Sequence, residues 1–272
     1  MPEPAVIAHR GFAGITPENT IEAARVASEH PSTDMIEIDV QPAACGTPVV
    51  IHDDRLEGTR DGRPLTDSEG LVWETSLEDL SNARILGTDE TVPTLETFLE
   101  VVDPGVGVNV ELKNPGTPSI RPGESLSPSV RAERREIWEP FVERVVDVCD
   151  SFDGDVLFSS FCAGALAATR NVAPEYPIGT LVADDLETGL GIAREYDSEA
   201  IHPPRNAVAG TALSTEPYAG VSEAPTVDLL DVARDEGRAI NVWTVDTWVQ
   251  FDQLRAVGVD GIIVDYPGLD SR

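Results

Sequence analysis

The chain has 272 residues, of which 19 are basic and 49 acidic, so its formal net charge is −30. This charge excludes nucleic acid and anionic membranes as favoured partners, because both are themselves negatively charged. The hydrophobic content of 41% is ordinary, and the length suits either two small domains or one large α/β barrel.

The basic residues are 18 arginines and a single lysine, Lys113, while the acids are spread along the whole chain. A surface rich in acid and poor in lysine is expected of a protein that works in concentrated salt, where screening removes the self-repulsion. Cys45, Cys149 and Cys162 follow no disulfide or zinc pattern, which indicates free thiols. We therefore expect a halophilic, cytoplasmic protein with no signal peptide, no membrane span and no stable membrane association. Its oligomeric state stays open.

Hydrophobic patterning predicts alternating strands and helices along the chain. In order, we expect a strand at 6–8, a helix at 18–28, strands at 35–40 and 49–52, a helix at 94–102 and a strand at 108–113. Residues 54–92 are polar and irregular apart from a short helix at 77–80, and 114–129 form a long loop. A helix at 130–150 precedes strands at 156–161, 178–182, 200–202, 240–245 and 261–264, with a helix after each of the first four.

Without the short strand at 49–52, this pattern contains eight strands that alternate with helices. Eight such units in about 270 residues are typical of a (β/α)8 TIM barrel. We expect one domain, residues 1–272, with an extra β-hairpin arm after the second strand. The stretch 114–136 is either a lid that reads the alcohol group of the substrate or a solvated loop, and we favour the loop because length alone is weak evidence of function.

The strand at 35–40 places Glu37 and Asp39 on one face and apolar side chains on the other, because side chains alternate along a strand. Two carboxylates on one face of an apolar strand repel each other and lose solvation, so they are tolerated mainly when a cation lies between them. The alternative is a half-exposed strand whose acids face water.

About eight residues separate this strand from the one at 49–52, too few for a parallel crossover. The second strand must therefore return antiparallel, with its turn near Gly46. Counting six residues in either direction from Gly46 places His52 opposite Val40 and close to Asp39.

The strand at 108–113 repeats the alternation, with Glu111 and Lys113 on one face. Catalytic residues of such barrels lie at the carboxyl ends of the strands, so polar residues of neighbouring strands should meet at one rim. The predicted group consists of His9, Arg10, Glu37, Asp39, His52, Glu111 and Lys113.

The chemistry of this group points to cleavage of a phosphodiester. Three carboxylates without cysteine favour a hard divalent cation, Mg²⁺ or Ca²⁺. His9 and His52 can act as general acid and base near neutral pH, and Arg10 and Lys113 can hold an anion. Trp243 is a core residue or a wall of the pocket, and we favour the wall.

Several motifs together resemble the glycerophosphodiester phosphodiesterase family. They are His9-Arg10-Gly11, Pro17-Glu18-Asn19-Thr20, Glu37-Ile38-Asp39-Val40, His52-Asp53, Pro93-Thr94-Leu95, Glu111-Leu112-Lys113, Ser159-Ser160-Phe161, Trp243-Thr244-Val245-Asp246 and Asp260-Gly261-Ile262-Ile263-Val264-Asp265. The resemblance implies a (β/α)8 barrel that hydrolyses glycerophosphodiesters to sn-glycerol 3-phosphate and an alcohol. It also implies a divalent cation on Glu37, Asp39 and Glu111, with His9 and His52 as acid and base and Arg10 and Lys113 on the phosphate.

Two alternatives differ in function. A phospholipase-like enzyme acting on intact lipids would need an exposed apolar rim, and no aromatic cluster in the loops supplies one. A catalytically silent binding barrel would lack a histidine or a metal ligand, and all of them are present.

Overall fold

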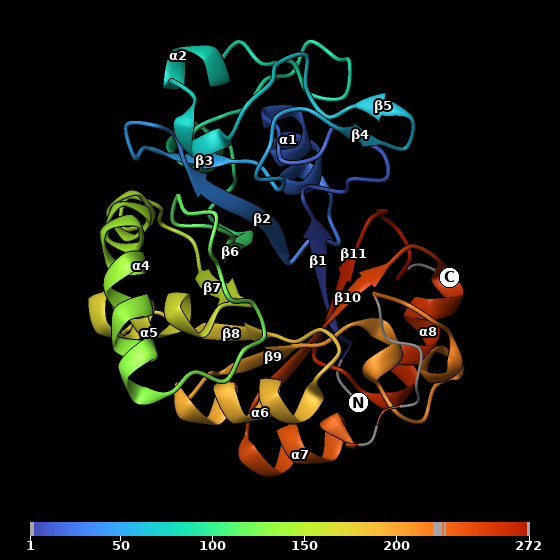
Figure 1. Cartoon of the computed structure of the whole chain (residues 1–272). Coiled ribbons are helices and arrows are strands. Elements are labelled where there is room, and N and C mark those ends of the chain that lie inside the picture. Colours follow the sequence, from blue (N-terminus) through green and yellow to red (C-terminus); the bar gives the residue numbers. More distant parts are fainter. Residues whose placement is uncertain (1–2, 220–224, 226, 271–272) are drawn as a thin grey trace.

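The computed structural model describes residues 3–219, 225 and 227–270, and within them eight parallel strands form a closed barrel. Because β1 pairs with both β2 and β11, the ring of strands is complete (Figure 1). This architecture confirms the predicted (β/α)8 barrel. In ring order the strands are β1 (Ala5–His9), β2 (Met35–Pro42), β6 (Gly107–Leu112), β7 (Val156–Ser160), β8 (Ile178–Leu181), β9 (Ala200–His202), β10 (Ala239–Val245) and β11 (Gly261–Val264).

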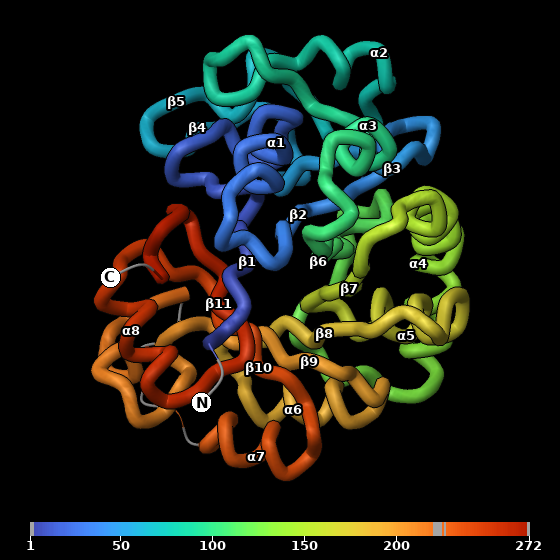
Figure 2. Tube along the Cα trace, turned by 180° about the vertical axis from the view of Figure 1, so that it is seen from behind, coloured from blue at the N-terminus to red at the C-terminus, as the bar shows by residue number. Residues whose placement is uncertain are grey.

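Helices surround this ring, as the view from behind also shows (Figure 2). Helix α3 begins within one residue of the expected position, where the hydroxyl of Thr94 accepts a hydrogen bond from the Thr97 amide. Helix α1 begins three residues later than expected, because the hydroxyl of Thr20 caps it by accepting from the Ala23 amide. Among the described helices, none combines the length and the apolar composition needed to cross a membrane. The main helices are α1 (Ile21–Glu29), α3 (Leu95–Leu99), α4 (Pro128–Cys149), α5 (Ala163–Val172), α6 (Leu186–Glu195), α7 (Leu229–Glu236) and α8 (Trp248–Val257).

Strand β2 separates an apolar face from an acidic one. Ile36, Ile38 and Val40 are fully buried in the main hydrophobic core. Glu37 and Asp39 alternate with them, and the parallel register pairs Glu37 with Asn109 and Asp39 with Glu111 on β6. Alternation and register together therefore bring acids of two neighbouring strands side by side.

Strand β3 (Pro48–Val50) pairs antiparallel with the end of β2, so the chain returns within a few residues. The register differs from the expected one: Val50, not His52, lies opposite Val40, and β3 ends before His52. The count from Gly46 was wrong because the pairing is centred one residue earlier, and an error of one residue at the turn displaces the partner by two. The amide of Ile51 still donates to the carbonyl of Asp39 at 2.9 Å, so His52 stays near that acid.

Residues 43–92 have a small hydrophobic core of their own, which their polar composition did not reveal. It joins Val49, Leu56, Val72 and Ile85 with five further buried residues, and it lies apart from the main core. The segment beyond β3 contains β4 (Thr59–Arg60), β5 (Arg63–Pro64), a 3-10 turn (Val72–Glu74) and α2 (Leu77–Leu80), the predicted short helix. Figure 1 shows it as a cap beside β3 and α1, outside the ring of strands.

Candidate active site

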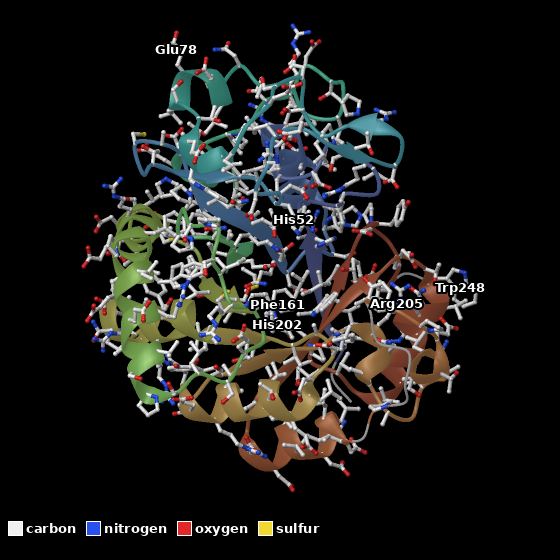
Figure 3. The ribbon with its side chains drawn as sticks, viewed as in Figure 1. His52, Glu78, Phe161, His202, Arg205 and Trp248 are labelled. Carbon is white, nitrogen blue, oxygen red and sulfur yellow. The ribbon has the colours of Figure 1, made fainter. Side chains whose placement is uncertain are left out.

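A cavity of about 360 Å³ opens at the carboxyl ends of β1, β2 and β6. Asp39 lies directly beside it with 1% of its surface exposed. In Figure 3 His52 lies on the β2 side of the ring and Phe161 lies near its centre. The cavity is lined by seven of the eight predicted site residues, namely His9, Arg10, Glu37, His52, Glu111, Lys113 and Trp243.

Glu37, Asp39 and Glu111 form a buried acidic cluster, each offering an oxygen within 4.8 Å of the other two. Burial and the neighbouring carboxylates of Asp39 and Glu111 raise the pKa of Glu37 well above its ordinary value. Oδ1 of Asp39 is buried and accepts no hydrogen bond from the described part of the chain. Three crowded carboxylates with an unused oxygen fit a hard divalent cation, which binds through oxygen ligands.

Two basic side chains lie against this cluster. Nε of Arg10 is 3.0 Å from Oδ2 of Asp39, and Nζ of Lys113 is 2.8 Å from Oε1 of Glu111 and 3.6 Å from Oδ1 of Asp39. Burial alone would raise the pKa of Asp39, but the charges of Arg10, His52 and Lys113 hold it well below its usual range. Lys113, the one lysine of the sequence, therefore lies within the acidic cluster.

Residues of the loop between β1 and α1 form hydrogen bonds with Asp39 and Arg10. Nδ2 of Asn19 donates to Oδ2 of Asp39 at 2.9 Å, while Oδ1 of Asn19 accepts from the Asp39 amide at 3.3 Å. Glu18 accepts a hydrogen bond from Nη1 of Arg10 at 3.0 Å. These contacts fix Asp39 and Arg10 relative to each other.

A carboxylate orients His9. Nδ1 of His9 lies 2.7 Å from Oδ1 of Asp265, the residue after β11, and Nε2 lies 3.9 Å from Oε2 of Glu37. Because Nδ1 is engaged, Nε2 is the nitrogen that faces the acidic cluster. No role for Asp265 was predicted, although its position at the end of the strand next to β1 was the signal that could have found it.

His52 is positioned through its backbone. Nε2 of Gln41 donates to the carbonyls of Ile51, His52 and Asp53, at 3.2, 3.0 and 3.1 Å. Nδ1 of His52 is 3.5 Å from Oδ1 of Asp53, whose Oδ2 in turn accepts a hydrogen bond from Arg60 at 2.6 Å. Gln41 was also missed, and its signal was the continued alternation of polar residues after Glu37 and Asp39 on β2.

Aromatic side chains form another wall of the cavity. The ring of Trp243 lies 5.9 Å from that of Phe161 and 6.0 Å from that of Tyr218. Nε1 of Trp243 donates to the carbonyl of His202 at 2.7 Å, which fixes the indole. Trp243 thus packs against the rings of Phe161 and Tyr218 and also lines the cavity.

The chain is similar in sequence to a known enzyme family. Residues 9–269 match the model of the glycerophosphoryl diester phosphodiesterase family. A glycerophosphodiester phosphodiesterase of Caldanaerobacter subterraneus is 30% identical over 96% of this chain and 94% of the relative. One of Bacillus altitudinis is also 30% identical, with the same two coverages.

Solved structures agree in fold. A phosphodiesterase of Oleispira antarctica, in complex with the product sn-glycerol-3-phosphate, superposes with a TM-score of 0.74 at 25% identity, covering 97% of this chain and 94% of that one. The glycerophosphodiester phosphodiesterase of Thermotoga maritima gives a TM-score of 0.69 at 22% identity, covering 97% and 96%. The chain therefore belongs to the glycerophosphoryl diester phosphodiesterase family, and it is an enzyme that hydrolyses glycerophosphodiesters.

Proposed function

We propose that this enzyme hydrolyses glycerophosphodiesters to sn-glycerol 3-phosphate and an alcohol in a metal-dependent reaction, with His9 and His52 as general acid and base. The observation that carries the proposal is the convergence of two imidazoles, an acidic cluster and two basic groups on one cavity. Cleavage of a P–O bond requires compensation of negative charge, proton transfer and binding of the phosphate, and each of these groups can provide one of them.

Glu37, Asp39 and Glu111 are the proposed ligands of a divalent cation, Mg²⁺ or Ca²⁺. Their donor set consists of oxygen alone, and burial together with the neighbouring carboxylates raises the pKa of Glu37, so a bound cation would stabilise the charged form of all three acids. When bound, such an ion offsets negative charge on the phosphate oxygens and polarises them.

His9 and His52 carry the protons. One neutral imidazole accepts the proton of the attacking hydroxyl or water, and the other, protonated, donates to the oxygen of the departing alcohol. Asp265 keeps Nε2 of His9 turned toward the acidic cluster, and Gln41 holds the backbone on which His52 lies. Both rings line the same cavity, so both can reach one bound phosphate.

Arg10 and Lys113 hold the phosphate. Asp39 and Glu111 fix their positions, so little conformational entropy is lost when substrate binds. Charge that develops on the non-bridging oxygens during the reaction is then met by donors already in place.

The test is hydrolysis of glycerophosphocholine and glycerophosphoethanolamine in high salt, with Mg²⁺ or Ca²⁺ and with a chelator. We expect release of sn-glycerol 3-phosphate that the chelator abolishes and the added ion restores. Turnover that persists after complete removal of metal contradicts the proposal, and cleavage of intact glycerophospholipids alone would favour a phospholipase-like enzyme.

The excess of acidic residues indicates the salt concentration in which the enzyme works. We infer a salt-adapted cytoplasmic enzyme, because a net charge of −30 destabilises a compact fold unless salt screens it.

A further inference from the structure

Two polar side chains, Asn109 on β6 and Ser159 on β7, line the inner part of the same cavity. We call this pair the polar floor. Both residues are 0% exposed. Within the described residues, neither amide atom of Asn109 nor the hydroxyl of Ser159 has a hydrogen-bond partner.

The polar floor lies beside the acidic cluster. The strand register pairs Asn109 with Glu37 and Ser159 with Glu111, so each member neighbours one of the proposed metal ligands. Ser160, the next residue of β7, makes the contrast clear. Its hydroxyl donates to the carbonyl of Leu112 at 2.8 Å and accepts from the Cys162 amide at 3.0 Å, so it is fully occupied by the fold.

A buried polar group without a hydrogen-bond partner destabilises the folded protein. Such groups on the wall of a cavity therefore indicate a ligand that forms the missing hydrogen bonds when it binds. The ligand must offer several donors and acceptors, because Asn109 presents both an N–H₂ and a C=O and Ser159 presents a hydroxyl. It must also lie next to the phosphate. The glycerol arm of the substrate has two free hydroxyls close to its phosphate, and each can both donate and accept.

We propose that Asn109 and Ser159 bind the free hydroxyls of the glycerol arm and thereby select glycerol over other alkyl groups. This inference rests on the proposed function, which assigns the phosphate to Arg10 and Lys113 in the same cavity. A site that pairs with substrate hydroxyls rejects an analogue that lacks them, since its own polar groups then stay unpaired.

The alcohol arm then points to a second cavity of about 560 Å³, which shares His9 and Arg10 with the first. Its other walls come from segments outside the ring of barrel strands, including Ile15, Arg60 of β4 and Tyr266, whereas the polar floor lies on barrel strands. Rigid strands suit the arm that every substrate shares, and loops suit the arm that varies.

The test is calorimetric titration of the full chain, in Mg²⁺ and high salt, with sn-glycerol 3-phosphate and with n-propyl phosphate, which lacks both hydroxyls. We expect the wild type to bind the glycerol compound at least about 10-fold more tightly. Asn109→Leu and Ser159→Ala should each reduce that preference several-fold while leaving the affinity for propyl phosphate unchanged. Ser160→Ala is the matched control, which should lower thermal stability and keep the preference.

Three outcomes would overturn the inference: no preference in the wild type, an unchanged preference in Ser159→Ala, or equal loss of both ligands together with weaker Mg²⁺ binding. The last would assign the pair to the metal site. If Asn109→Leu fails to fold, Asn109→Ser and Ser159→Ala decide the question. Binding is measured without turnover, so a failed proposed function, which shows as no hydrolysis by the wild type, is recognised separately.

Discussion

Nδ1 of His9 and Oδ1 of Asp265 lie 2.7 Å apart, although 256 residues separate them in the sequence. The contact forms because β11 and β1 are neighbours in the closed barrel. A carboxylate bound to one ring nitrogen of a histidine fixes the tautomer and the orientation of the ring. The residue after the last strand, Asp265, therefore determines which nitrogen of His9 faces the acidic cluster.

Asp265→Asn should therefore lower kcat by about 100-fold or more, with a smaller effect on KM, because the His9 ring loses its fixed tautomer. Steady-state kinetics with saturating divalent cation measure this. Asp246→Asn, which changes an exposed acid after β10, is the control. Unchanged kcat in Asp265→Asn would mean that the contact is structural.

Glu111→Gln should weaken the binding of Mg²⁺ or Ca²⁺ by about 10-fold or more, because it removes one of three charged oxygen ligands. Titration calorimetry of the metal-free protein provides the measurement. Glu100→Gln, on the surface after α3, should bind the ion as the wild type does. Equal affinities in both variants would exclude Glu111 as a ligand.

Burial of His202 should make the free energy of unfolding depend on pH. Its ring is fully buried, and burial lowers its pKa from 6.5 to about 3. Unfolding then takes up a proton between these two values, so stability is complete above the unfolded pKa and is lost as pH falls from 6.5 toward 3. In this window the wild type should lose up to about 1.4 kcal/mol per pH unit more than His202→Gln. Denaturant unfolding at several pH values tests this, and parallel slopes in the two proteins would contradict it.

Salt should raise activity. The substrate is an anion and the protein carries −30, so long-range repulsion opposes binding in dilute buffer and weakens as the ionic strength increases. We expect kcat/KM to rise from low to about molar salt, at constant divalent cation. A steady fall over that range would contradict both this effect and the inferred adaptation.

Local alternation of side chains made much of the fold and site predictable. Glu37 and Asp39 on one strand and Glu111 and Lys113 on another could be identified from spacing alone, because period-two patterning is a property of each strand. The order of the strands then followed from the regular βα sequence.

Properties that depend on distant residues could not be predicted in this way. The register at His52 was two residues off because it is set by the β2–β3 turn, and the support from Gln41 exists only in that register. The core of residues 43–92 joins the predicted strand at 49–52 and the predicted helix at 77–80 to apolar residues scattered between them, such as Leu56 and Val72, and no local pattern showed that these segments pack together.

The central claim is that His9 and His52 transfer the protons of one reaction. The most direct measurement is kcat for glycerophosphoethanolamine in high salt with saturating Mg²⁺, comparing His9→Ala and His52→Ala with His30→Ala, whose ring packs on Phe12. We predict a loss of about 1,000-fold in each of the first two variants, with Mg²⁺ affinity retained, and near wild-type turnover in the third. Wild-type kcat in either His9→Ala or His52→Ala would contradict the account.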